Sequence, residues 1–269
     1  MSASDRLVLL QIEDGIATIT FNRPDAGNAM SLAFVRELAD VVESVEHDPD
    51  VRCVVLTGSG RFFSVGGDIG GFRDAGTEVP SVLAQITHHL HDAVARLVRM
   101  HKPLVTAVNG PAAGAGLGLA VIGDFAIASD TAHFSTAYTA IGLTPDAGTS
   151  TILPRLIGLR KTQEMALTNR RVPAAEAVEI GLITQVVAPA DLMEEAIRTA
   201  RGLVEGPVAA FGAVRRMIAA GYEQPLEAQL DLEARTICEA AGSPEGREGI
   251  AAFLAKRPAV FASNAPVCS

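Results

Sequence analysis

The chain has 269 residues, 48% of them hydrophobic, and its 22 lysines and arginines against 31 aspartates and glutamates give a formal charge of −9. This composition excludes disordered and fibrous proteins, and the length suits one large domain or a domain with a smaller appendage. The excess of acidic residues argues against a nucleic-acid-binding surface, which needs grouped lysines and arginines.

The spacing of the cysteines and the composition of the N-terminus favour a reducing, cytoplasmic location. Cys53, Cys238 and Cys268 lie far apart without a C-x-x-C pair, which predicts neither a disulfide framework nor a zinc site. The N-terminus has no signal-peptide architecture. Residues 103–123 are uncharged, but their prolines and five glycines favour a buried strand, turn and helix over a membrane span.

The first part of the chain is predicted to alternate strands with helices. Alternating apolar residues predict strands at 7–12 and 16–21, joined as a hairpin by Asp14-Gly15, and Ser31 is a candidate N-cap for a helix that ends before Pro49. The next elements are a strand at 51–57, a helix at 80–100, a strand at 104–108, a helix at 114–122, a strand at 125–128, short helices within 149–182 broken by Pro154, Gly158 and Pro173, and a strand at 184–187.

The pattern changes after residue 190. Helices are predicted at 190–205, 207–220, 225–241 and 245–256, with no strand between them. The alternation before this point and the helical run after it predict an α/β fold with mostly parallel strands, followed by an all-helical C-terminal section.

Two glycine-rich turns each follow a predicted buried strand. The first is Ser-Val-Gly-Gly-Asp at 64–68, and the second, at 109–116, leads into a helix. Glycine allows close backbone approach and a helix N-terminus offers free N–H groups, so the pair could bind an oxyanion; tight turns without a ligand are the alternative. Rossmann, P-loop and nucleophile-elbow motifs do not match.

Asp146 is the only Asp, Glu, Lys or Arg residue between Asp130 and Arg155. A lone carboxylate in an apolar loop suits proton transfer. Because Asp146 precedes Thr149 by three residues, it could instead cap the following helix.

Three histidines, His88, His89 and His91, lie close together on the predicted helix at 80–100. His88 and His91 have a spacing that could hold a metal, but no acidic or cysteine partner recurs at ligand spacing, so no metal site is predicted. A solvated helix face is favoured, with His91 bordering the apolar stripe.

Several segments together resemble the crotonase, or enoyl-CoA hydratase/isomerase, superfamily, over residues 8 to 261. The segments that carry the resemblance are Asn22-Arg23-Pro24, residues 63–69, 109–117 and 142–148, and residues 249–257. The resemblance implies a spiral of ββα turns at 5–189 that binds an acyl-CoA, and a helical section at 190–263 that assembles homotrimers or hexamers. It implies coenzyme A as part of the substrate and no prosthetic group.

The resemblance also implies roles for individual residues. Gly67 and Ala115 match the two backbone N–H groups that hold the thioester oxygen in this superfamily. Arg23 and, from a neighbouring subunit, Phe253 and Lys256 match positions near coenzyme A. Arg23 and Lys256 would supply local positive charge that an acidic chain otherwise lacks.

The side chains at the remaining positions separate the reactions of the superfamily. Typical hydratases carry glutamates at the positions of Gly118 and Tyr138, so both hydration carboxylates are missing here. Asp146 matches the carboxylate of members similar to the phenylacetate-pathway epoxide and Δ3,Δ2-enoyl-CoA isomerases. The resemblance therefore favours an enoyl-CoA isomerase with one aspartate as proton shuttle.

Other reactions stay open. In 4-chlorobenzoyl-CoA dehalogenases an aspartate at the Asp146 position attacks an aromatic carbon and a histidine at the His91 position activates water, although Tyr138 stands where those enzymes carry tryptophan. Asp146, His91 and Tyr138 are thus all candidate catalytic residues. A thioester hydrolase, a divergent hydratase and a silent acyl-CoA-binding scaffold are further alternatives.

Overall fold

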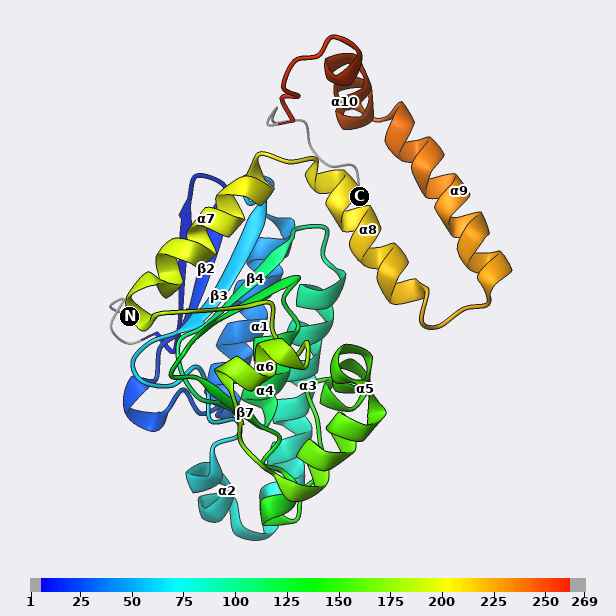
Figure 1. Cartoon of the computed structure of the whole chain (residues 1–269). Helices are drawn as coiled ribbons and strands as arrows, with labels where there is room; N and C mark the ends of the chain where they lie inside the picture. The colour runs from blue at the N-terminus through cyan, green and yellow to red at the C-terminus, as the bar shows by residue number, and fades with distance from the viewer. Residues whose placement is uncertain (1–5, 262–269) are drawn as a thin grey trace.

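A six-stranded sheet in the order β1-β2-β3-β4-β6-β9 organises the computed structural model, which describes residues 6–261 (Figure 1). The strands are β1 (Val8–Glu13), β2 (Ile16–Phe21), β3 (Cys53–Gly58), β4 (Leu104–Val108), β6 (Phe125–Ser129) and β9 (Gln185–Val187). β1 and β2 are antiparallel and the other pairs are parallel, which confirms the predicted class. Residues 5, 263 and Cys268, which were named in the sequence predictions, lie outside the described residues.

The predicted hairpin is present and turns at Asp14-Gly15. Both residues have left-handed backbone angles, with φ of 51° and 78°. Two left-handed residues in succession match the twist of the flanking strands, so the turn fixes the β1–β2 register.

Helices cover both faces of the sheet, and alternate residues of each strand serve the two faces. Val54 and Leu56 of β3 pack into the core formed with α1 (Leu32–His47) and α3 (Val79–Arg99). Cys53 and Val55 pack against α7 (Leu192–Val204) on the opposite face (Figure 1). α7 therefore covers one face of the sheet. The division of the chain into a core at 5–189 and a helical section at 190–263 stays a prediction.

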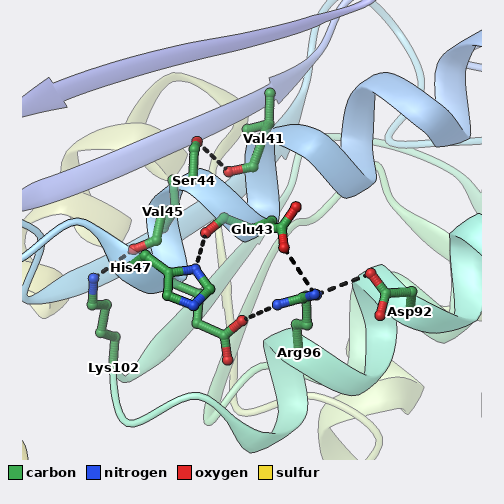
Figure 2. A network of polar contacts seen from close by, with 9 residues as sticks. Val41, Glu43, Ser44, Val45, His47, Asp92, Arg96 and Lys102 are labelled. Carbon is green, nitrogen blue, oxygen red and sulfur yellow. Dashed lines mark hydrogen bonds and ion pairs between the residues drawn. The ribbon is translucent and has the colours of Figure 1, made fainter. Parts of the chain in front are cut away.

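Polar contacts join α1 to α3 and to the segment that follows it (Figure 2). Arg96 of α3 donates to Glu43 at 3.1 Å and Glu46 at 2.6 Å on α1, and to Asp92 at 2.9 Å on its own helix. The Lys102 ammonium donates to the Val45 carbonyl oxygen at the C-terminal end of α1. α1 begins at the predicted N-cap, since the Ser31 side chain accepts from the Phe34 N–H. These contacts fix the position of α3, which carries His91.

A small second sheet and several short elements lie beside the main sheet. The order of the small sheet is β5-β7-β8. Its strands are β5 (Ala112–Ala113), β7 (His133–Ser135) and β8 (Val172–Pro173); the short helices are α2 (Ile69–Ala75), α4 (Ala115–Val121) and α6 (Ala174–Glu179), with 3-10 turns at Pro24–Ala26, Gly76–Glu78, Thr139–Ile141 and Pro189–Asp191.

The helix α5 (Thr149–Thr168) differs from the prediction of a break at Pro154. The helix continues through Pro154 and is interrupted at Gly158, where φ is 75° and ψ is 161°. Pro154 has no N–H, so one helical hydrogen bond to the Ser150 carbonyl is lost. Ser150 is exposed, and water can hydrogen-bond to its carbonyl oxygen instead. The proline therefore does not end the helix.

The last three helices stand away from the sheet (Figure 1). They are α8 (Val208–Ala220), α9 (Leu226–Gly242) and α10 (Pro244–Leu254), as the sequence predicted. Arg215 of α8 docks them on the core, because its guanidinium donates to Asp124 and to the Lys102 and Leu97 carbonyl oxygens, each at 2.8 Å. Among residues 6–261, no helix is long and apolar enough to cross a membrane.

Candidate active site

The two glycine-rich turns of the sequence lie against each other. Ser64 and Ala112 form a parallel bridge, and the Ala113 N–H donates to the Ser64 carbonyl at 2.9 Å. Gly66 has φ of 89°, and a Cβ on it would lie 2.8 Å from the Ala113 oxygen and 3.4 Å from the Ala115 nitrogen. Only glycine permits this approach, so it brings the Gly66-Gly67 peptide next to the start of α4.

The Gly67 and Ala115 amides are both available as donors. Within residues 6–261 neither N–H has a hydrogen-bond acceptor. Ala115 is the first residue of α4 and is 5% exposed, so its N–H belongs to the end of the helix dipole that favours negative charge. Two unpaired amides beside each other are suited to bind an oxyanion, as the resemblance implied.

Two buried polar residues support the first turn: Ser64, which begins it, and Asn28, which the sequence patterns did not indicate. The Ser64 hydroxyl donates to the Asn28 carbonyl at 2.9 Å and accepts from the Gly66 N–H at 3.1 Å. The Asn28 side chain donates to the carbonyls of Phe62 and Phe63. Neither residue repeats at a periodic position, so only the three-dimensional structure shows their role in holding the loop.

Asp146 and Tyr138 form the polar centre of the site. The Tyr138 hydroxyl donates to Asp146 Oδ1 at 2.5 Å. Burial, followed by the charge of Asp146, raises the pKa of Tyr138, so the phenol keeps its proton and stays a donor. A Cβ on Gly114 would lie 3.8 Å from Tyr138 Cε1, so the tyrosine ring lies near the turn that presents Ala115.

The helix-capping alternative for Asp146 is wrong for its side chain. The N-cap of α5 is Gly148, which offers no side chain. The Asp146 backbone carbonyl accepts from the Thr149 N–H at 3.0 Å and from the Thr149 hydroxyl at 2.8 Å. The Asp146 carboxylate therefore does not cap the helix, and it accepts from the Tyr138 hydroxyl.

Within residues 6–261, His91 is the one of the three clustered histidines that forms a hydrogen bond to this loop. His91 Nε2 accepts from the Ala147 N–H at 3.2 Å. The rings of His88 and His89 pack edge to face at 5.2 Å, and His89 contacts Arg36. In the part of the chain that the structure describes, no group of three His, Cys, Asp or Glu residues could hold a metal ion.

Gly118, where typical hydratases carry a glutamate, has no room for any side chain. A Cβ there would lie 2.8 Å from the Ala147 oxygen, 2.9 Å from Ala147 Cβ and 3.3 Å from Thr149 Cγ2. The sequence shows that the carboxylate is missing, and the structure adds that the space is filled by the residue after Asp146.

The three residues expected near coenzyme A lie apart in one chain. Arg23 lines a hollow of about 350 Å³ with its neighbours 22–26, but its guanidinium is paired with Asp68 at 3.1 Å and also contacts the Ala29 carbonyl. Phe253 is 83% exposed on α10, and Lys256 follows that helix. α10 lies far from α4, the helix that follows the second glycine-rich turn of the same chain (Figure 1). A coenzyme A role for all three stays a prediction.

Comparison with known proteins places this geometry in one family. The family model described as "Enoyl-CoA hydratase/isomerase" matches residues 11–264. A Rhodobacter capsulatus protein named probable enoyl-CoA hydratase is 41% identical, over 93% of this chain and 96% of that protein. The 1,2-epoxyphenylacetyl-CoA isomerase of Escherichia coli is 37% identical, over 94% and 97%.

A third relative and a solved structure widen the range of reactions. The 4-chlorobenzoyl coenzyme A dehalogenase-2 of an Arthrobacter species is 35% identical, over 95% of this chain and 93% of that protein. The crystal structure of an enoyl-CoA hydratase from Polaromonas sp. JS666 superimposes with a TM-score of 0.89 at 30% identity, over 94% of this chain and 98% of that chain. The printed names of these relatives do not agree on one reaction. The chain belongs to the enoyl-CoA hydratase/isomerase family.

Proposed function

We propose that this protein is an enoyl-CoA isomerase that moves a carbon–carbon double bond through one aspartate. The observation that carries the proposal is the pair of hydratase positions, because Tyr138 occupies one and Ala147 fills the space beside Gly118 at the other. Water addition lacks its usual acid and base. Asp146 is a carboxylate hydrogen-bonded to Tyr138, whose ring lies near Gly114 in the turn before Ala115, and it needs no second carboxylate to move a proton.

The reaction follows from these positions. The thioester oxygen accepts hydrogen bonds from the Gly67 and Ala115 amides, and the Asp146 carboxylate removes a proton from C2 of a 3-enoyl thioester. The electron pair of the C–H bond delocalises into a dienolate, whose oxygen the amides stabilise; one such donor is worth about 3 kcal/mol of barrier. The protonated Asp146 then returns the proton to C4, and the double bond lies between C2 and C3.

Replacement of Asp146 by asparagine tests this proposal. Asp146→Asn keeps the shape of the side chain but removes the base, so migration of the double bond should be lost while the affinity for the thioester stays within about threefold. Asp130→Asn is the matched control, since Asp130 is an exposed aspartate outside the site. Full activity of Asp146→Asn would overturn the assignment.

A second candidate is dehalogenation or hydrolysis of an aryl thioester. The 35% identity to the 4-chlorobenzoyl coenzyme A dehalogenase-2 of an Arthrobacter species favours it. In dehalogenation Asp146 attacks the halogen-bearing ring carbon, halide leaves, and water then cleaves the resulting aryl ester to release the hydroxyaryl thioester and the free Asp146 carboxylate. Intact-protein mass spectrometry after mixing with a 4-halobenzoyl thioester distinguishes the candidates, because the isomerase should form no adduct.

The remaining functional assignments rest on family membership. We propose that Arg23 and, from a neighbouring subunit, Phe253 and Lys256 contact coenzyme A. We also propose a trimer or hexamer that works in the cytoplasm without a prosthetic group. A scaffold that binds acyl-CoA without turnover would bind thioesters equally well in the wild type and in Asp146→Asn and would convert none of them.

A further inference from the structure

His91 makes one hydrogen bond that fixes the state of its ring. Its Nε2 lies 3.2 Å from the nitrogen of Ala147, and a backbone N–H can only donate. Nε2 therefore accepts, and a neutral imidazole that accepts through Nε2 carries its proton on Nδ1. The Nε2 lone pair, which a general base would use, is occupied by the backbone.

The Ala147 amide depends on this contact. Ala147 is fully buried, and among residues 6–261 its N–H has His91 Nε2 as its hydrogen-bond acceptor and no other. A buried N–H without an acceptor is strongly disfavoured, because it loses its hydrogen bond to water without replacement. Loss of the histidine acceptor should therefore shift the peptide.

The peptide that His91 holds has an unfavourable backbone conformation. Ala147 has φ of 49° and Gly148 has φ of 77°, so two successive residues are left-handed. A residue with a Cβ avoids this region unless its surroundings impose it. The surroundings here are the His91 acceptor on one side and Gly118 on the other, where the Ala147 oxygen and Cβ fill the space of a side chain.

This conformation sets the direction of the carboxylate. Asp146 directly precedes Ala147, and its Oδ1 accepts from the Tyr138 hydroxyl at 2.5 Å. A rotation of the Ala147 peptide would move Asp146 relative to the backbone amides of Gly67 and Ala115. It would also open the space beside Gly118. The His91–Ala147 hydrogen bond therefore supports both the orientation of Asp146 and the packing of Ala147 against Gly118.

We infer that His91 is a positioning residue: its neutral imidazole holds the Ala147 peptide and thereby aims Asp146, and it does not act as the general base. This inference rests on the proposed function for its kinetic consequence, since it assigns His91 a role in the isomerisation. The state of the ring can be measured without any substrate.

Three variants separate positioning from base catalysis. The side-chain amide introduced by H91Q can accept from the Ala147 N–H through its oxygen but cannot act as a base, so H91Q should keep turnover within about threefold of the wild type. H91L removes the acceptor and should lower kcat by ~100-fold with KM nearly unchanged, the scale of a misplaced catalytic group. H88L is the matched control, since His88 is exposed and, in the described part of the chain, makes no hydrogen bond to the loop.

The ring state is read by NMR of the 15N-histidine-labelled full-length protein in mildly alkaline buffer, with H91Q identifying the His91 signals. A signal of the Nδ1–H form supports the inference, and an Nε2–H form overturns it whatever the activity. Loss of activity in H91Q equal to that in H91L, with both proteins folded, would also overturn it. If the wild type converts no enoyl thioester, the proposed function fails and the NMR result still tests the contact.

Discussion

Gly118 and Ala147 pack so closely that one added carbon should be costly. The Cβ of Gly118→Ala would meet the Ala147 oxygen at 2.8 Å and Ala147 Cβ at 2.9 Å, and neither atom can rotate away. Overpacking of this kind costs about 1–3 kcal/mol, so we expect a lower free energy of unfolding in urea and slower isomerisation as Asp146 moves.

A second glycine provides the control. Gly202 lies in α7 with nothing within 4 Å of its Cβ position, so Gly202→Ala should stabilise the protein by up to about 1 kcal/mol through helix propensity. Equal stability of Gly118→Ala and the wild type would show that the loop at 146–148 adapts freely. The packing of Ala147 against Gly118 would then be no evidence against a hydratase.

At the residue scale, the sequence indicated the right side chains but not their contacts. Asp146, Tyr138 and His91 were candidates because of their chemistry and the family resemblance. The Tyr138–Asp146 hydrogen bond joins two loop positions, and the His91–Ala147 bond joins α3 to a loop 56 residues later. Such contacts depend on tertiary packing, which no periodic pattern reports.

At the element scale, Lys102 links the C-terminal end of α1 to the segment before β4. The Lys102 residue is 9% exposed, and its ammonium donates to the Val45 and Asp48 carbonyl oxygens, each at 2.5 Å (Figure 2 shows the Val45 bond). Burial lowers the pKa of Lys102 from 10.5 to about 8, against the opposing effect of Asp48 and Glu46. A neutral amine still has two N–H groups for the two carbonyls.

This shift predicts how stability depends on pH. Below pH 8 the lysine is charged in both states and folding bears the full cost of burying the charge. Between pH 8 and 10.5 the unfolded chain binds more protons, so the contribution of Lys102 to stability rises with pH. In urea unfolding, the free energy of unfolding of the wild type should therefore rise relative to that of Lys102→Met over this pH range. A constant or shrinking difference would contradict the shift.

Helices with a clear cap and an apolar stripe were predictable, while features that depend on neighbours were not. α1 begins after Ser31 as predicted, and α8 to α10 lie close to their predicted ranges. The continuity of α5 through Pro154 depends on a carbonyl near solvent, and the packing of α7 on the sheet depends on which apolar face is left uncovered. Neither can be read from a local pattern.

At the scale of the whole molecule, the C-terminal helices leave many apolar side chains exposed. An apolar groove lies between α8 and α9, and large apolar residues are exposed along these helices and α10: Val214, Ile218, Leu230, Ile237, Ile250, Phe253 and Leu254. An apolar groove with exposed large apolar residues along the helices around it is typical of protein–protein interfaces. It supports the proposed trimer or hexamer.

Light scattering tests the assembly. The wild type should have the mass of three or six chains, and Ile237→Asp should lower it, because Ile237 is 70% exposed and lines the groove. Glu239→Gln, an exposed change on the same helix, should leave the mass unchanged. A wild type that is monomeric at working concentration would contradict the assembly and the neighbouring-subunit role of Phe253 and Lys256.

The most direct test of the central claim is the exchange of the C2 proton of a 3-enoyl thioester in deuterated water, followed by mass spectrometry alongside double-bond migration. If Asp146 is the proton shuttle, the wild type should move the double bond without forming a covalent adduct, with deuterium incorporated to the extent that the protonated Asp146 exchanges with solvent, and Asp146→Asn should neither move the double bond nor incorporate deuterium. Undiminished exchange in Asp146→Asn, or a covalent ester on Asp146, would contradict the account.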